Sequence, residues 1–250
     1  LENYKNAIKD YTKVIRLNPN NKVAFLYRGL AKNDISSAFN DFSKVIELDP
    51  RNEDAYIHRG QAKRVLKDYQ GAINDFTKVI RLNPKIKEAF LYRGLAKDEL
   101  EDYQNAINDF SKVIELDPRN EDAYIYRGQT KYRFSYYEGA LKDFSKVIKL
   151  NPENESAYLW RGFTEDELEN YKNAIKDYTK VIELDPRNED AYLNRGLAKN
   201  ELEDYQNAIN DFSKVIELNS DNQSAYFNRG ISKFNLKDFQ DATNDFSKAI

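Results

Sequence analysis

The side chains best able to do chemistry in this sequence are a single histidine and two long series of arginines and aspartates. His58 is the only histidine and cysteine is absent, so a Ser–His–Asp or Cys–His arrangement has at most one candidate base. Tyrosine or asparagine stands at the equivalent position of most related segments, which argues against a catalytic role for His58. Zinc ligands are lacking, and the nine glycines never cluster into a phosphate-binding loop. We therefore predict a protein that is not an enzyme and that holds no metal and no cofactor.

Acidic pairs offer a second candidate chemistry, because two neighbouring carboxylates can act as acid and base. The pairs Asp98-Glu99 and Asp166-Glu167 lie near the predicted ends of helices and among lysines. We interpret them as solvated surface.

The arginine and aspartate series follow one period. Each arginine directly precedes a glycine, and each aspartate directly precedes an aromatic residue of the next predicted helix. Both positions border the expected helix packing, so we predict a structural ladder of partly buried Arg–Asp pairs. The alternative is an arginine-lined anion site. The ladder comprises Arg59, Arg93, Arg127, Arg161 and Arg195 with Asp75, Asp109, Asp143, Asp177 and Asp211.

The segment KVIELDPRNEDAY sets that period. It occurs at Lys44–Tyr56, Lys112–Tyr124 and Lys180–Tyr192, with related copies halfway between, so the repeating unit has 34 residues. A fixed period of this size indicates a repeat array in which one two-element unit is stacked along an axis.

Each copy of this segment reads as a helix end, a turn and a helix start. Asp49-Pro50 stops the first helix, since proline removes a donor and disfavours helix in the residue before it. Asn52 suits the N-cap of the next helix, with carboxylates in its first turn. Ile86 replaces this asparagine in one unit, so we expect that helix to begin less firmly.

Small and aromatic residues recur in each unit at helical spacing. Ala55, Tyr56 and Gly60 share one face of a first helix, and Ala72 and Phe76 share one face of a second. With these positions and the prolines, the whole chain resembles the tetratricopeptide repeat (TPR) family. The resemblance implies an all-α fold, a right-handed α-α superhelix (solenoid) of helix-turn-helix repeats whose first helices line a concave groove.

The period divides one solenoid domain, 1–250, into repeats. Residues 1–21 supply the second helix of a truncated repeat, and 223–250 form a repeat truncated at its C-terminal end. The unit at 22–52 lacks three residues at its joint, so we expect a changed helix angle or a second helix that starts late. The full repeats span 53–86, 87–120, 121–154, 155–188 and 189–222.

The partner-binding residues are predicted on the first helices, at positions that vary while the scaffold stays constant. Tyrosine and tryptophan suit such a surface because they offer a large contact area at low entropic cost. The alternative is that these rings only pack between neighbouring helices. The predicted groove residues are Tyr27, His58, Tyr92, Tyr126, Gln129, Tyr132, Trp160, Phe163, Asn194 and Asn228.

Composition narrows the class of partner. With a formal net charge of -3, the chain has no electrostatic reason to bind nucleic acid, and it has no apolar run long enough for membrane insertion. The leading hypothesis is a protein-interaction scaffold that binds a peptide or a helical segment of a partner. The alternatives are a regulatory or targeting arm of an enzyme whose catalytic domain lies outside these residues, and a structural spacer.

Compartment and assembly stay open. The chain has no methionine, even at position 1, and no signal peptide, so we expect a piece of a longer protein or a processed one. Without cysteine no disulfide framework indicates a compartment. A soluble, cytoplasmic protein is the favoured expectation, and the oligomeric state is unknown.

Overall fold

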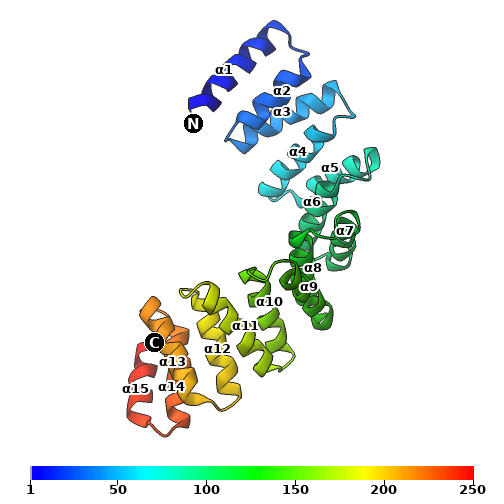
Figure 1. Ribbon diagram of the computed structural model, residues 1–250. Helices are drawn as coiled ribbons and strands as arrows, with labels where there is room; N and C mark the ends of the chain where they lie inside the picture. The colour runs from blue at the N-terminus through cyan, green and yellow to red at the C-terminus, as the bar shows by residue number, and fades with distance from the viewer. Residues whose placement is uncertain (1) are drawn as a thin grey trace. The chain divides into compact units, whose positions relative to one another are not determined.

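The computed structural model describes residues 2–250, which form fifteen α-helices and no β-strand (Figure 1). From residue 22 on, the helices form consecutive pairs joined by short turns. The first helices are α2 (Lys22–Ala31), α4 (Glu53–Val65), α6 (Lys87–Asp98), α8 (Glu121–Arg133), α10 (Glu155–Glu167), α12 (Glu189–Glu201) and α14 (Gln223–Asn235). The second helices are α1 (Glu2–Leu17), α3 (Ile35–Leu48), α5 (Tyr69–Leu82), α7 (Tyr103–Leu116), α9 (Tyr137–Leu150), α11 (Tyr171–Leu184), α13 (Tyr205–Leu218) and α15 (Phe239–Lys248).

The helices fall into two compact units, residues 1–126 and 127–250, whose boundary lies inside α8. Within each unit a helix packs mainly on the helix before it and the helix after it, as α4 does on α3 and α5, and α12 on α11 and α13. The same succession is visible in Figure 1 for α1–α7 and for α9–α15. Nearest-neighbour packing is typical of a solenoid. The predicted all-α fold of helix-turn-helix repeats is confirmed.

An asparagine fixes the start of most first helices. The side chain of Asn52 accepts a hydrogen bond from the backbone N–H of Ala55 at 2.8 Å, and the equivalent asparagines of α2, α8, α10, α12 and α14 do the same. Ile86 precedes α6 and makes no such bond. One backbone donor that the other helices satisfy with an asparagine therefore lacks that cap, as the sequence predicts.

The first helices end in a second repeated device. Six of the seven joints between a first and a second helix hold one residue with a positive φ, for example Lys67 at 61° and Glu169 at 57°. The next residue then bonds back to the last turn, as the Asp68 N–H does to the Lys63 carbonyl at 2.8 Å. This left-handed ending satisfies helix carbonyls and turns the chain sharply into the second helix.

In the shortened repeat the second helix, α3, does not start late, so that part of the prediction is wrong. α3 has 14 residues, as α5 and α7 do, and the Asp34 carboxylate caps its start by accepting the Ser37 N–H at 2.7 Å. The three missing residues are lost from α2, which has 10 residues where α4 has 13. The joint after α2 keeps three residues, as the joint after α4 does, but no residue in it has a positive φ. A changed crossing angle in this repeat stays a prediction.

The core of each pair is a close approach of glycine to an aromatic ring. A Cβ built on Gly60 would lie 2.7 Å from Cε1 of Phe76, and one built on Gly162 would lie 2.6 Å from Cε1 of Tyr178. Alanines at the fully buried positions 55, 72, 157 and 174 let the helices approach further. The arginine directly before each glycine therefore lies at the same place beside the second helix in every repeat.

Candidate functional site: a polar ladder and an aromatic cluster

Every arginine of the ladder forms a bidentate ion pair within its own repeat. In the first unit, Arg59 donates from Nε to Oδ2 of Asp75 at 2.9 Å and from Nη2 to Oδ1 at 2.7 Å. In the second, Arg161 does so with Asp177 at 2.8 and 2.6 Å. The same pairing joins Arg93–Asp109, Arg127–Asp143 and Arg195–Asp211. It also joins Arg28–Asp41 and Arg229–Asp245, so the ladder of the described chain has seven pairs.

These aspartates are only 3–5% exposed, so the ion pairs are largely removed from water. A buried carboxylate needs a partner, because leaving it alone costs several kcal/mol. The arginines meet that need through two parallel hydrogen bonds each. This geometry favours the structural ladder over the anion site, since the anion that faces each guanidinium is part of the chain.

The third guanidinium nitrogen links one repeat to the one before it. Nη1 of Arg195 lies 3.0 Å from the Thr179 hydroxyl, and Nη1 of Arg229 lies 3.0 Å from the Ser213 hydroxyl. In the first unit, Nη1 of Arg93 lies 3.1 Å from the Thr77 hydroxyl. The ladder therefore bridges neighbouring repeats as well as the two helices of one repeat.

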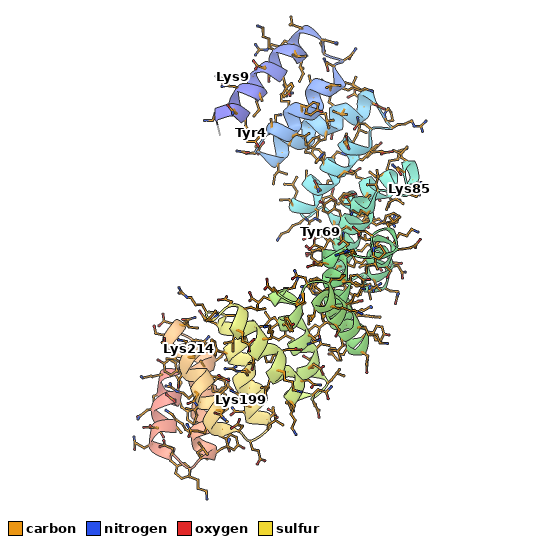
Figure 2. All side chains as sticks on the ribbon, in the orientation of Figure 1. Tyr4, Lys9, Tyr69, Lys85, Lys199 and Lys214 are labelled. Atoms are coloured by element: carbon orange, nitrogen blue, oxygen red, sulfur yellow. The ribbon has the colours of Figure 1, made fainter. Side chains whose placement is uncertain are left out.

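A lysine four residues after the arginine is a member of the ladder that the sequence analysis missed. Nζ of Lys199, labelled in Figure 2, lies 2.6 Å from Oδ2 of Asp211, and the same contact measures 3.0 Å between Lys63 and Asp75. Equivalent contacts join Lys32–Asp41, Lys97–Asp109, Lys131–Asp143 and Lys233–Asp245. The recurrence of lysine at this position was the available signal. Glu165 replaces it in the α10–α11 repeat.

The predicted groove residues of the first unit pack against the second helix of the preceding repeat. The rings of His58 and Phe42 stack with centroids 5.4 Å apart, and Tyr92 lies 5.8 Å from Phe76 in a tilted arrangement. Tyr27 stacks on Tyr11 at 6.0 Å and is 49% exposed, and Tyr126 lies 6.0 Å from Phe110. Each ring thus has one face against the scaffold.

In the second unit, five aromatic residues form one contiguous group, which we call the aromatic cluster: Tyr132, Tyr137, Trp160, Phe163 and Tyr178. Trp160 stands at its centre, with ring centroids 5.6 Å from both Tyr132 and Phe163 in edge-to-face arrangements. Tyr137 lies 5.6 Å from Tyr132, and Phe163 lies 5.9 Å from Tyr178. Trp160 also stacks on Phe144 at 6.4 Å. The structure therefore brings together three of the predicted groove residues: Tyr132, Trp160 and Phe163.

The other predicted groove residues of this unit lie outside the cluster's ring contacts. Gln129 is half-buried on α8, one turn before Tyr132. Asn194 and Asn228 are half-buried, and each donates a hydrogen bond from its side chain to the backbone carbonyl four residues earlier, at 2.7 and 2.8 Å. Their amides serve the helices on which they stand.

Two carboxylates border the aromatic cluster. Glu167 accepts hydrogen bonds from the hydroxyls of Tyr132 at 2.9 Å and Tyr137 at 3.3 Å. Asp166 accepts a short hydrogen bond from the Tyr178 hydroxyl. Burial and the neighbouring Glu167 raise the pKa of Tyr132 above its usual value, so this phenol stays a donor.

Asp166 corrects the interpretation of the Asp166-Glu167 pair as solvated surface. Asp166 is half-buried, and its Oδ1 is closed off from solvent with no hydrogen-bond partner among residues 2–250. Burial, the largest cause, raises the pKa of Asp166 to about 6. The pattern of acidic residues at a helix end did not reveal this, because the burial comes from helices packed against α10.

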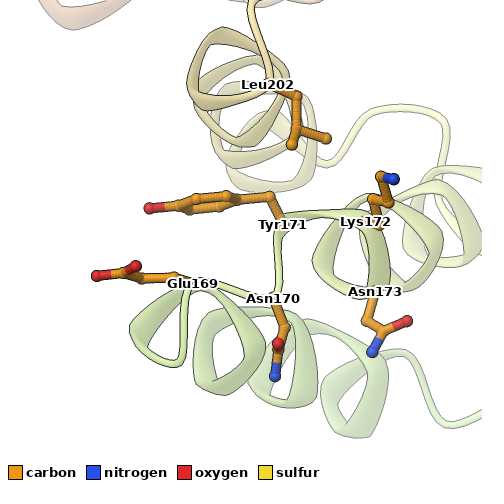
Figure 3. Close-up of a pocket in the computed structure, with 6 residues that line it drawn as sticks. All are labelled: Glu169, Asn170, Tyr171, Lys172, Asn173 and Leu202. Carbon is orange, nitrogen blue, oxygen red and sulfur yellow. The ribbon is translucent and has the colours of Figure 1, made fainter.

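A shallow pocket of about 380 Å³ opens beside the α10–α11 joint (Figure 3). Tyr171 and Leu202 provide its apolar part, and Glu169, Asn170, Lys172 and Asn173 its polar part. These residues come from the α10–α11 joint, the start of α11 and the residue that follows α12. They include no nucleophile beside a base, so they do not form a catalytic arrangement.

Within residues 2–250, no group of three or more His, Cys, Asp or Glu side chains is placed to hold a metal ion. In the same part of the chain, no helix combines the length and the apolar character that crossing a bilayer requires.

Comparison with known proteins follows the repeat pattern. Three family models described as "Tetratricopeptide repeat" match the chain, one at residues 1–21, one at 58–121 and 91–154, and one at 189–222. A fourth, described as "TPR repeat", matches residues 167–202. No curated protein matches the chain.

Solved structures share the fold. The crystal structure of MamA is 26% identical, covers 68% of this chain and 93% of its own, and has a TM-score of 0.64. A tetratricopeptide repeat protein from Parabacteroides merdae is 22% identical over 96% of this chain and 92% of its own, with a TM-score of 0.69. YrrB, described as "a TPR protein with an unusual peptide-binding site", is 22% identical over 74% of this chain and 95% of its own, with a TM-score of 0.63.

Proposed function

Because the chain belongs to the tetratricopeptide repeat family, we propose that it is a protein-interaction scaffold that binds a peptide or helical segment of a partner on its first helices. Repeats of this kind are generally non-catalytic and present extended surfaces to other proteins. Within the second unit, the proposed centre of that surface is the aromatic cluster.

The observation that carries the proposal is the clustering of residues that differ between otherwise similar repeats. At the position of Trp160, the two preceding repeats have tyrosine and the two following ones asparagine. Phe163 stands where other repeats have leucine, glutamine or isoleucine. In the structure Trp160 contacts both Phe163 and Tyr132, which concentrates large rings at one place on a repeating scaffold. Aromatic side chains of this kind dominate binding energy at protein interfaces.

Charge indicates the chemistry of the partner segment. Asp166, Glu167 and Glu169 form an acidic group at the end of α10 and its joint, and Glu167 is hydrogen-bonded to Tyr132 of the aromatic cluster. A partner residue that reaches this rim meets negative charge beside aromatic rings, which suits lysine or arginine. We therefore propose a segment with an apolar or aromatic anchor and adjacent basic residues.

A displayed random-peptide library, selected on the purified chain, tests the proposal. Selected peptides should combine an apolar or aromatic anchor with lysine or arginine. Trp160→Ala should weaken their binding by roughly 30-fold or more, the effect of losing a central interface anchor. Trp160→Tyr restores the residue of the preceding repeats and serves as the matched variant that preserves packing on Phe144. It should weaken binding by a smaller factor.

Asn228→Ala, at the same position of a distant repeat in the unit, controls for general effects on the scaffold. Helical content and melting temperature of all variants must match those of the parent protein. Peptides whose affinity is the same for the parent, Trp160→Ala and Asn228→Ala would place the binding surface elsewhere and contradict the proposal.

A further inference from the structure

The α10–α11 repeat lacks a lysine ammonium group that the other six helix pairs place beside their buried aspartate. In those six pairs, a lysine four residues after the ladder arginine places Nζ 2.6–3.0 Å from Oδ2 of the buried aspartate. Glu165 stands at this position in α10, and the ladder aspartate of this repeat, Asp177, is 5% exposed. Its Oδ2 accepts Nε of Arg161 as in the other repeats.

A cavity of about 260 Å³ lies at this place, lined by Arg161, Glu165, Asn173, Lys176 and Asp177. The lost lysine also leaves the arginine less covered. The Arg161 side chain is 25% exposed, whereas the other six ladder arginines are 15–19% exposed. The substitution therefore leaves an open space beside a buried carboxylate.

We propose that this cavity binds a primary alkylammonium group, supplied by a lysine side chain of a partner or by a free polyamine. The other repeats show which groups receive it. Nζ of Lys131 lies 2.7 Å from Asp143 and 3.3 Å from the carbonyl of Gly139, and Nζ of Lys63 lies 3.2 Å from the carbonyl of Gly71. An ammonium has three donors to place. In the α10–α11 repeat they meet Asp177, the Glu165 carboxylate and the backbone at Asn173, which occupies the position of the two glycines.

The charge of the site supports this ligand. One arginine, one lysine and one aspartate give the other ladder sites a formal charge of +1 (1 + 1 - 1). The same three positions, Arg161, Glu165 and Asp177, give -1 here (1 - 1 - 1), and Lys176 brings the lining of the cavity to zero. The equivalent place in the α8–α9 repeat, which has lysine at both positions, carries +2, so this cavity is two units less positive. Because Glu165 accepts a hydrogen bond from the Asn170 side chain at 3.0 Å, its carboxylate is held at the joint rather than directed freely into solvent.

Lys176 lines the same cavity, and its positive charge repels an ammonium group. The α8–α9 repeat shows that the two charges are compatible, because Lys142 occupies the position of Lys176 there and lies near enough to lower the pKa of Lys131 by repulsion. Burial is the larger cause of that lowering, and Lys131 nevertheless keeps its 2.7 Å contact with Asp143. A lysine at this position therefore does not prevent an ammonium from occupying the site.

The site is separate from the aromatic cluster. On an α-helix each residue turns by about 100°, so Arg161 and Glu165 point roughly 100–140° away from Trp160 around the axis of α10. Occupation of one site does not require the other, and the inference stands apart from the proposed function.

Ligand-observed saturation-transfer NMR on the whole chain tests the proposal, with N-acetyl-lysine-N-methylamide as the probe. The parent protein should transfer saturation to the ε-methylene of the probe. N-acetyl-norleucine-N-methylamide, which has the same alkyl chain without the ammonium, should show less than a fifth of that signal. Equal signals from the two probes would overturn the proposal.

Glu165→Lys supplies the lysine of the other repeats and should abolish the signal, with helical content unchanged by circular dichroism. Glu165→Gln removes the charge without filling the cavity and should reduce the signal severalfold, so the test does not depend on one variant folding. Lys199→Glu recreates the substitution in the α12–α13 repeat and should roughly double the number of sites. Binding that none of these three changes alters would contradict the assignment. Spermidine, run in parallel, distinguishes the sources: tighter binding than the lysine amide indicates a free polyamine, and weaker binding indicates a partner's lysine.

Discussion

The Tyr178 hydroxyl donates a hydrogen bond to Oδ2 of Asp166, while Oδ1 of the same carboxylate is buried and has no hydrogen-bond partner in the described residues 2–250. Phenylalanine occupies the position of Tyr178 in the other six helix pairs, so this phenol is specific to the α10–α11 repeat. A half-satisfied carboxylate of this kind lowers stability when it is ionised, because its charge is poorly solvated.

Asp166→Asn should therefore stabilise the protein at neutral pH. The pKa of Asp166 is raised to about 6 in the folded chain from its ordinary value of 3.8, so the folded state binds the proton more tightly than the unfolded state does. Stability contributed by the protonated group is present below about pH 4 and is lost as the pH rises through about 6. We expect Asp166→Asn to raise the free energy of unfolding by on the order of 1–2 kcal/mol at pH 7.5, because Asp166 is only partly buried and water screens part of its charge. The gain should shrink as the pH falls toward 4 in denaturant titrations.

Asp190→Asn is the matched control for this series, because Asp190 is an exposed carboxylate on the neighbouring first helix. Its effect should be small and should not follow the same pH dependence. If Asp166→Asn raises the free energy of unfolding by the same amount from pH 4 to 7.5, ionisation of Asp166 is not what destabilises the parent protein.

A pair of double-mutant cycles should show which residues of the ladder are coupled. Arg127 donates to Asp143 at 2.9 and 2.6 Å, whereas Arg161 donates to Asp177 and lies 3.2 Å from the Ser145 hydroxyl. The Arg127/Asp143 cycle should give a coupling of about 1 kcal/mol or more in the free energy of unfolding, as a largely buried pair does. The Arg161/Asp143 cycle should be near additive, and the reverse result would mean that the pairing runs between repeats.

Gly196→Ala should destabilise the α12–α13 pair by about 1–3 kcal/mol, the usual cost of overpacking a core. The added Cβ would lie 2.6 Å from Cε1 of Phe212, and the fully buried ring has little room to move. Thermal unfolding measures the loss, and Phe212→Leu in the alanine background should recover part of it. A wild-type melting temperature for Gly196→Ala would show that the helices can separate freely.

Ile86→Asn should stabilise the chain by about 1 kcal/mol, because it adds the N-cap that α6 lacks. Asn188→Ile is the reverse substitution, and it should remove the 2.9 Å hydrogen bond to the Ala191 N–H. The two variants should shift the melting temperature in opposite directions. Shifts of the same sign would mean that side-chain packing at this position outweighs the cap.

The repeat pattern predicted most of the fold because few residues determine it. Proline after a helix, asparagine before the next and glycine opposite a ring each have one physical role, and each recurs at a fixed spacing. Irregular positions were harder. The deletion before α3 predicts either a changed helix angle or a late start of α3. Asp34 caps α3, which keeps its full length of 14 residues, and the shortening falls on α2.

The candidate site was only partly predictable for a related reason. Trp160, Tyr132 and Phe163 could be selected by type and position. Trp160 meets Phe163 on its own helix and Tyr132 from the preceding repeat. The burial of Asp166 could not be predicted in this way, because it depends on side chains from other helices and on the single tyrosine at 178. Glu165 was visible as an exception in the sequence, yet its meaning required knowing that the usual lysine bonds the buried aspartate.

The hydroxyl that receives each arginine from the next repeat is a serine or a threonine at one fixed position, as at Ser145, Thr179 and Ser213. Either hydroxyl serves as the acceptor, so the junctions between repeats are chemically interchangeable. Excision of residues 189–222 would bring Arg229 to Thr179 in place of Ser213, with the same donor and the same kind of acceptor. Recombination in steps of 34 residues can thus lengthen or shorten the array without the creation of a mismatched junction, and the number of repeats is free to change faster than the sequence of any one of them.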